Sequence, residues 1–222
     1  MKLISSLSGV AAVRMNGEET SPANGLLQRD LISRIAQWYE FSVVPPDSPG
    51  GNPLLQFQSG ICHMGENRIP ITQLLITSDG DAISAQNTSL ADRVLTDYLT
   101  HLEKEMAYRL EGVQLDRIYQ SYLLVELEQK LVDKMFFDAG RLLIGEALGA
   151  NSKSSYSIKR WTLGQDASNY LPSQPSLVQF LPTDFVIERR ANEPFERNRF
   201  FCTAPLTTQA HIDILERMER VS

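Results

Sequence analysis

The spacing of apolar residues predicts two helices in the first half of the chain. In residues 21–41 the apolar positions are three to four residues apart, which is the period of one helix face. The same spacing continues through residues 90–106. Ser89 is followed three positions later by Asp92, a pattern that resembles a capping box and predicts the start of the longer helix. We expect Gly112 to end or kink this helix.

Alternation of apolar and polar residues predicts a β-meander between the two helices. Residues 43–53 are rich in proline and glycine and therefore predict a loop. Strands are expected at 54–62, 70–78 and 81–87, and the last two are joined at Asp79-Gly80, a favoured hairpin pair.

A second β region and a helix are predicted for the C-terminal part. The expected strands are residues 157–163, 176–181, 184–190 and 197–204, separated by proline-containing loops. Thr207 or Thr208 is expected to cap a final helix.

Residues 115–149 allow two interpretations. As a helix, Leu124, Leu127, Leu131 and Met135 form one stripe. As a strand, residues 119–127 alternate, but the face that should be polar is too apolar for a half-buried strand. The pattern favours the helix.

Together these elements predict an α+β protein, with an antiparallel β-meander near the N-terminus, a helical middle, a second antiparallel β region and a C-terminal helix. We expect a single domain over residues 1–222, which could be subdivided into 1–111 and 112–222. No internal repeat is visible in the sequence. The apolar stripes of residues 90–149 predict a surface for a protein partner or a second copy.

Composition places the chain among ordinary globular proteins. It has 222 residues, 42% of them apolar, and a net charge of −6. No apolar run approaches the roughly 20 residues that cross a bilayer, so we expect no membrane contact. Residues 1–19 resemble a secretory signal only weakly. Two cysteines, Cys62 and Cys202, do not form a disulfide framework and favour a reducing cytoplasm.

Cys62 and His63 are the first candidate for chemistry, because an imidazole can activate a thiol. Neighbours on a strand point to opposite faces, however, so His63 is a poor base for Cys62. A cysteine nucleophile would need His101 or His211 brought close by the fold. A zinc site from Cys62, His63, Cys202 and His211 lacks the usual ligand spacing, so we expect no metal there.

Asp116 and Glu128-Gln129-Lys130, separated by an apolar run, resemble the site of PD-(D/E)xK nucleases. The resemblance implies Mg²⁺ held by Asp116 and Glu128, with Lys130 orienting the attacking water, and Glu105 in place of the family's helical acid. It covers about 30 residues. Glu126 and Leu127 separate the run from the acid-x-lysine, which departs from the family pattern.

Cations alternate with aromatic residues in the C-terminal β region. Single-stranded nucleic acids are bound by such combinations, and the candidates are Lys159, Arg160, Trp161, Arg197 and Arg199. The alternative interpretation places Trp161, Phe200 and Phe201 in the core and pairs the arginines with Glu188, Glu193 and Glu196. The overall acidity argues against sequence-independent wrapping of nucleic acid.

From the sequence we therefore expect a non-catalytic binding or interaction subunit of a cytoplasmic assembly, without a cofactor. The alternatives are the Mg²⁺-dependent nuclease and, after it, the single-stranded nucleic-acid-binding protein. A hydrolase using Cys62 is a weaker hypothesis.

Overall fold

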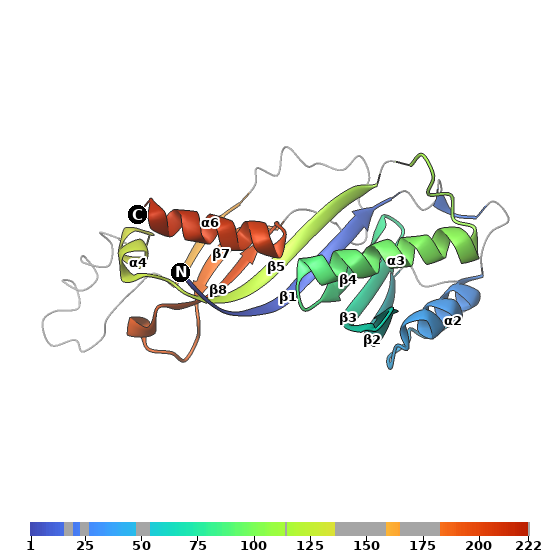
Figure 1. The fold of residues 1–222 in the computed structure, drawn as a ribbon, viewed down its shortest axis with the longest axis horizontal. Coiled ribbons are helices and arrows are strands. Elements are labelled where there is room, and N and C mark those ends of the chain that lie inside the picture. The colour runs from blue at the N-terminus through green and yellow to red at the C-terminus, as the bar shows by residue number, and fades with distance from the viewer. Residues whose placement is uncertain are drawn as a thin grey trace, which may run out of the picture.

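The protein, represented by a computed structural model, joins eight strands into one antiparallel sheet. The structure describes residues 1–15, 20–22, 27–47, 54–113, 115–135, 159–164 and 183–221. The order of strands across the sheet is β2-β3-β4-β1-β5-β8-β7-β6 (Figure 1). In chain order the elements are β1 (Lys2–Arg14), α2 (Gln28–Tyr39), β2 (Leu54–Met64), β3 (Asn67–Thr77), β4 (Gly80–Ala85), α3 (Thr88–Met106), β5 (Asp116–Glu126), α4 (Gln129–Met135), β6 (Arg160–Leu163), β7 (Phe185–Arg189), the short 3₁₀ helix η2 (Phe195–Arg197), β8 (Arg199–Ala204) and α6 (Thr208–Arg220).

The described helices pack on one face of this sheet. The apolar stripe of α3, including Leu95 and Leu102, is fully buried against residues such as Ile83 of β4. In the second half, Leu215 of α6 packs with Leu123 and the other inward-facing residues of β5. Figure 1 shows α3 and α6 lying along the sheet. No described helix lies on the opposite face, which we call the open face.

The predicted α+β class, the N-terminal meander and the C-terminal helix are confirmed. The meander turns at Gly80, whose φ of 151° suits glycine. Thr207 caps α6 by accepting a hydrogen bond from the Ala210 N–H. The cap of α3 is Asn87, which accepts from the Leu90 N–H, and not Ser89. This helix ends at Met106, six residues before Gly112. The expected strand at 176–181 lies outside the described residues.

The favoured helical interpretation of residues 115–149 holds for α4, and residues 136–149 lie outside the described ranges. It is wrong for residues 116–126. They form β5, which pairs with β1 on one side and β8 on the other. Leu123, Leu124 and Val125 are all buried, so both faces of this part of the strand are apolar and its alternation is lost. The apolar stripe of α3 is also not available to a partner, because the sheet already covers it.

The topology contains a repeat that the sequence does not show. Among the described elements, a long strand, a helix, three antiparallel strands and a second helix occur twice, first as β1 to α3 and then as β5 to α6. The sheet order is symmetric about the β1/β5 pair. Gly9 pairs with Ser121 at the centre, and these two residues pair outward with Ala85 and Ala204 respectively. The two units are therefore related by an approximate two-fold axis at Gly9 and Ser121.

Two helix starts meet close to this axis. The Thr88 N–H donates to Thr208 Oγ1 at 3.1 Å, and the Thr208 N–H donates to Thr88 Oγ1 at 2.7 Å. Each threonine thus satisfies a backbone donor that the other helix leaves free. The start of α3 also lies directly over Gly9, where an added Cβ would be 2.1 Å from the Thr88 nitrogen. Glycine is required here by the close approach of two backbones.

Candidate functional site

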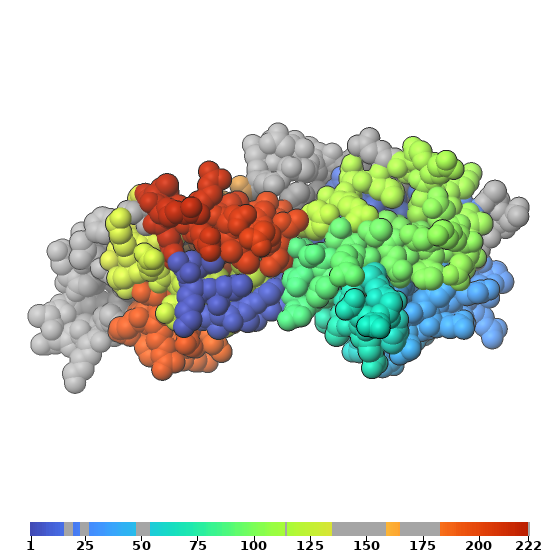
Figure 2. Space-filling model, viewed as in Figure 1, coloured from blue at the N-terminus to red at the C-terminus, as the bar shows by residue number. Residues whose placement is uncertain are grey.

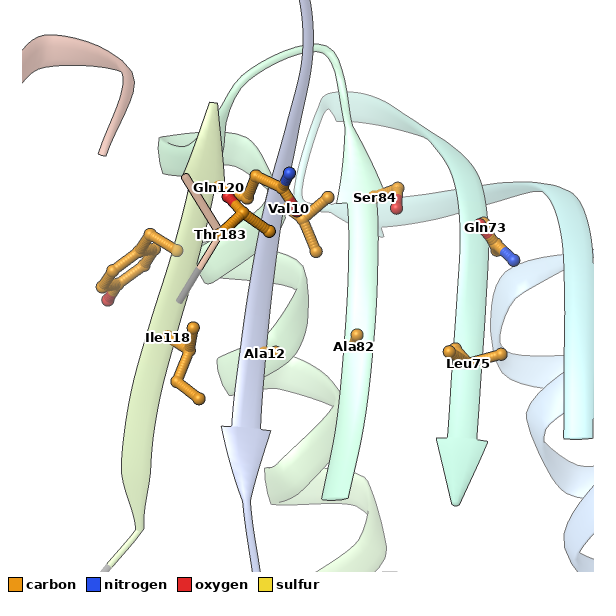
Figure 3. Close-up of a pocket in the computed structure, with 10 residues that line it drawn as sticks. Val10, Ala12, Gln73, Leu75, Ala82, Ser84, Ile118, Gln120 and Thr183 are labelled. Atoms are coloured by element: carbon orange, nitrogen blue, oxygen red, sulfur yellow. The ribbon is translucent and has the colours of Figure 1, made fainter. Parts of the chain in front are cut away.

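The open face of the sheet has a hollow at the junction of the two units, built by two rows of side chains. The first row crosses β5, β1, β4 and β3 through paired positions (Figure 3). It consists of Ile118, Ala12, Ala82 and Leu75. Because the central pair are alanines and the outer pair are large, the row forms a trough.

The second row lies beside the first on the same strands. It consists of Gln120, Val10, Ser84 and Gln73. Thr183, which precedes β7, lies beside Gln120 at one side of the hollow (Figure 3). The row supplies two amides and a hydroxyl next to an apolar floor, so both hydrogen-bond donors and acceptors face the hollow.

The pocket formed by these rows has a volume of about 220 Å³ and no charged lining residue. Pockets for drug-sized ligands and cofactors usually occupy roughly 300–1,000 Å³. General acid–base catalysis needs a titratable group at the reacting atoms. Among the described lining residues that group is Tyr119, whose hydroxyl donates to Asp92 Oδ1 at 2.9 Å and whose pKa is raised by burial. Its size and chemistry therefore suit one apolar side chain together with a neighbouring amide.

The fold does bring a histidine near Cys62, through a shared carboxylate. On β2, Cys62 points into the core while His63 is exposed and lies 3.3 Å from Glu40, as strand alternation predicts. The Cys62 thiol donates to Asp97 Oδ2 at 3.7 Å, and His101 Nε2 lies 3.6 Å from the same oxygen. The Tyr39 hydroxyl donates to it at 2.9 Å.

This arrangement does not activate the thiol. Burial, together with the Asp97 carboxylate, raises the pKa of Cys62 to about 12. A nucleophilic cysteine needs the opposite shift, toward the thiolate. The cluster instead links β2 and α2 to α3, because Asp97 of α3 accepts hydrogen bonds from Cys62 of β2 and Tyr39 of α2.

His101 is held in place by further contacts on the helical side. Its ring stacks on Trp38, with centroids 4.7 Å apart, and its Nδ1 contacts Glu105. The Trp38 indole N–H donates to the other Glu105 oxygen at 3.0 Å. The hydrogen bond from His101 lowers the pKa of Glu105. Glu105, the expected helical acid of a nuclease, thus contacts residues of α2 and α3.

His211 belongs to α6, where its ring packs on Phe185 with centroids 5.4 Å apart, whereas Cys62 is on β2. It is fully buried, its Nδ1 is 2.8 Å from Ser121 Oγ, and burial lowers its pKa to about 4. Cys202 is also buried, and burial raises its pKa to about 12. A serine–histidine pair without solvent access has no route to a substrate.

The structure does not bring the expected nuclease residues together. Asp116 begins β5 and Glu128 follows its end, so the 11 residues of the strand, at about 3.3 Å each, put roughly 35 Å between them. Lys130 lies in α4, and the Glu128 N–H donates to Glu219. These residues form no common site in the described structure.

The arginines of the C-terminal β region pair with acids, as the alternative interpretation predicted. Arg199 and Arg197 contact Glu193 at 3.2 and 3.9 Å, and Arg160 lies 3.9 Å from Glu188. Trp161 and Phe200 pack into the core. The expectation for Phe201 is wrong, since its side chain is 40% exposed. Exposed Lys159 accepts a backbone hydrogen bond from Arg189.

Comparisons with known proteins give no family for the chain. No protein-family model matches it, and no curated protein is significantly similar to it. Among the described residues, no group of three or more histidine, cysteine, aspartate or glutamate side chains is placed to hold a metal ion. No helix in the described ranges is long and apolar enough to cross a membrane.

The pocket residues were missed in the sequence because no local motif marks them. Except for Thr183, they come from four strands whose neighbours are set by the sheet order, and β1 itself was not expected. Ser5, Ser6 and Ser8 interrupt its apolar pattern, and its ladder with β5 shifts register twice. The one available signal is the pair of small residues, Ala12 and Ala82, among larger apolar neighbours.

Proposed function

We propose that this chain is a non-catalytic interaction subunit that binds a protein partner through the open face of its sheet. The observation that supports the proposal is the uncharged hollow at the junction of the two units. A partner would insert an apolar side chain between Ile118 and Leu75, above the two alanines. The amides of Gln73 and Gln120 would bond to the partner's backbone, because an amide both donates and accepts.

A cytoplasmic location is consistent with the two cysteines being free thiols. Cys62 and Cys202 are free, and they lie in separate core clusters. Two cysteines in different cores cannot form a disulfide without rearrangement. The proposal therefore places the assembly in a reducing compartment.

The proposal is tested by purifying a tagged chain from the cells that produce it and measuring the mass of the complex by light scattering. Ser84→Arg places a charge in the pocket from a half-exposed position. Gln37→Arg adds the same charge on the exposed side of α2 and serves as the matched control. We expect a complex of fixed stoichiometry with the parent and with Gln37→Arg, and its loss with Ser84→Arg.

Circular dichroism and thermal melting show whether both variants keep the fold. A parent that remains a free monomer in such extracts contradicts the proposal. So does a complex that survives in a folded Ser84→Arg variant.

A further inference from the structure

The first part of β1 is a free sheet edge in the middle of the molecule. Gly9 to Arg14 pairs with β4 and β5, whereas Lys2 to Ser8 pairs with β5 alone. Within the described chain, no strand pairs with the outer edge of this segment. Unpaired N–H and C=O groups along a strand edge form a template for another strand.

The side chains along this edge are apolar and exposed. Leu3, Ile4 and Leu7 have 40%, 37% and 46% of their surface exposed. The ladder with β5 shifts register between Leu3 and Ser5 and again between Ser6 and Ser8, so Ile4 and Leu7 have no partner residue on β5. Proteins usually protect a free edge with lysine, proline or β-bulges. In residues 2–8 the two register shifts are such irregularities, but Lys2, at one end, is the only lysine or proline.

The edge is set back from the outline of the sheet. Beyond Gly9 the sheet continues through β4, β3 and β2. The start of α3 closes this end, where Ser6 Oγ donates to the Gln86 carbonyl at 3.0 Å. Figure 2 shows the N-terminal residues, in blue, at the surface between α3, in green, and the orange segment around β8. The neighbouring elements hinder the approach of the same edge of a second copy, whereas one extended segment fits.

We propose that the outer edge of β1, from Lys2 to Ser8, binds an extended segment of a partner protein as an additional antiparallel strand. Every described strand pair in the sheet is antiparallel, which favours that direction. Main-chain hydrogen bonds would give affinity, and alternate side chains would give specificity. This edge differs from the pocket of the proposed function, so the inference goes beyond it.

The chemistry of the edge defines the segment. Residues 3 to 9 of β1 carry no charge, so the centre of the segment is about six uncharged residues with alternating aliphatic side chains. Lys2 is exposed and lies at the N-terminal end of β1. In an antiparallel pair the C-terminal end of the segment lies there, and an acidic residue at that end complements Lys2.

The test is selection of a phage-displayed library of random nine-residue peptides on the full chain. We expect enriched peptides with alternating aliphatic residues and an acid near the C-terminus. Leu7→Lys should lower the affinity of the chain for a selected synthetic peptide at least tenfold. Leu163→Lys, on the exposed edge strand β6, is the matched control and should leave binding unchanged. Peptide binding should also slow amide hydrogen exchange in residues 2–8.

The proposal is overturned if no such peptide is enriched, or if folded Leu7→Lys binds as well as the parent. Equal loss in a folded Leu163→Lys variant also contradicts it, because binding would then not be specific to the edge of β1. A dimer of the chain that Leu7→Lys dissociates would assign the edge to a second copy instead. Ser84→Arg should leave peptide binding intact, so this result is independent of the pocket.

Discussion

Buried titratable side chains are the residues whose chemistry the fold changes most. Asp81 is almost fully buried beneath α3 and accepts a hydrogen bond from the Tyr98 hydroxyl at 3.0 Å. Burial raises its pKa to about 7, and the Tyr98 hydrogen bond only partly opposes that effect. The unfolded carboxyl has its ordinary pKa near 3.8. The folded protein therefore binds this proton more tightly than the unfolded chain.

For Asp81→Asn we expect a gain in stability that depends on pH. Because the folded pKa is raised, ionisation of Asp81 lowers the free energy of unfolding as pH increases from about 4 to about 7. The variant cannot ionise and avoids this loss, which at 1.36 kcal/mol per pKa unit is at most about 4 kcal/mol. Urea unfolding of both proteins at pH 4.5 and 8.5 measures it. A difference that is the same at both pH values contradicts the expectation.

The two thiols are expected to be unreactive in the folded protein. Cys62 and Cys202 are each 1% exposed, and both have a pKa of about 12. A thiol reagent at pH 8 needs access and a thiolate. Ellman's reagent should therefore modify neither cysteine in buffer and both in guanidinium chloride. Rapid reaction of one thiol in the folded chain would restore the hypothesis of a Cys62 nucleophile.

At the scale of elements, the contact between β1 and α3 depends on the absence of a side chain. A Cβ on Gly9 would lie 2.1 Å from the Thr88 nitrogen, and neither backbone is free to move. Since overpacking a core costs about 1–3 kcal/mol and sometimes more, Gly9→Ala should lose at least about 3 kcal/mol. Gly164→Ala is the control, because its Cβ would meet only the Asp184 carboxylate at 3.3 Å. Equal and small losses of thermal stability in Gly9→Ala and Gly164→Ala would contradict this expectation.

The elements differ in how well the sequence predicts them. Helices α2, α3 and α6 and the Asp79-Gly80 turn could be predicted, because the pattern that indicates each of them is local in the sequence. Strand β5 could not be predicted, because Leu123, Leu124 and Val125 are buried on both faces and the apolar–polar alternation of a strand is therefore missing. For β1, serines and two register shifts obscure the period. Pocket residues depend on strand order, which no local pattern specifies.

At the scale of the whole molecule, two similar units share one sheet and one helix junction. The repeat is hidden because equivalent positions differ in type, such as Gly9 and Ser121. Thr88 and Thr208, each the first residue of its helix, are identical, as are the equivalent residues Ala85 and Ala204. Their mutual hydrogen bonds link the units across the axis.

Replacing both threonines should show that they act as a pair. Thr88→Val and Thr208→Val should each cost about 1–2 kcal/mol, as loss of a cap does. The double variant should cost less than the sum by at least about 0.5 kcal/mol, because each single change already breaks the shared bonds. Thr100→Val, on the exposed side of α3, should be nearly neutral. Additive effects in urea unfolding would contradict the coupling.

The central claim is that a partner occupies the open face of the sheet. Photo-crosslinking in the cells that produce the protein tests it most directly, with benzoylphenylalanine at Gln120 in the pocket or at Gln37 on α2. We predict one discrete protein adduct from position 120 and none from position 37. No adduct from position 120, or the same adducts from both positions, would contradict the claim.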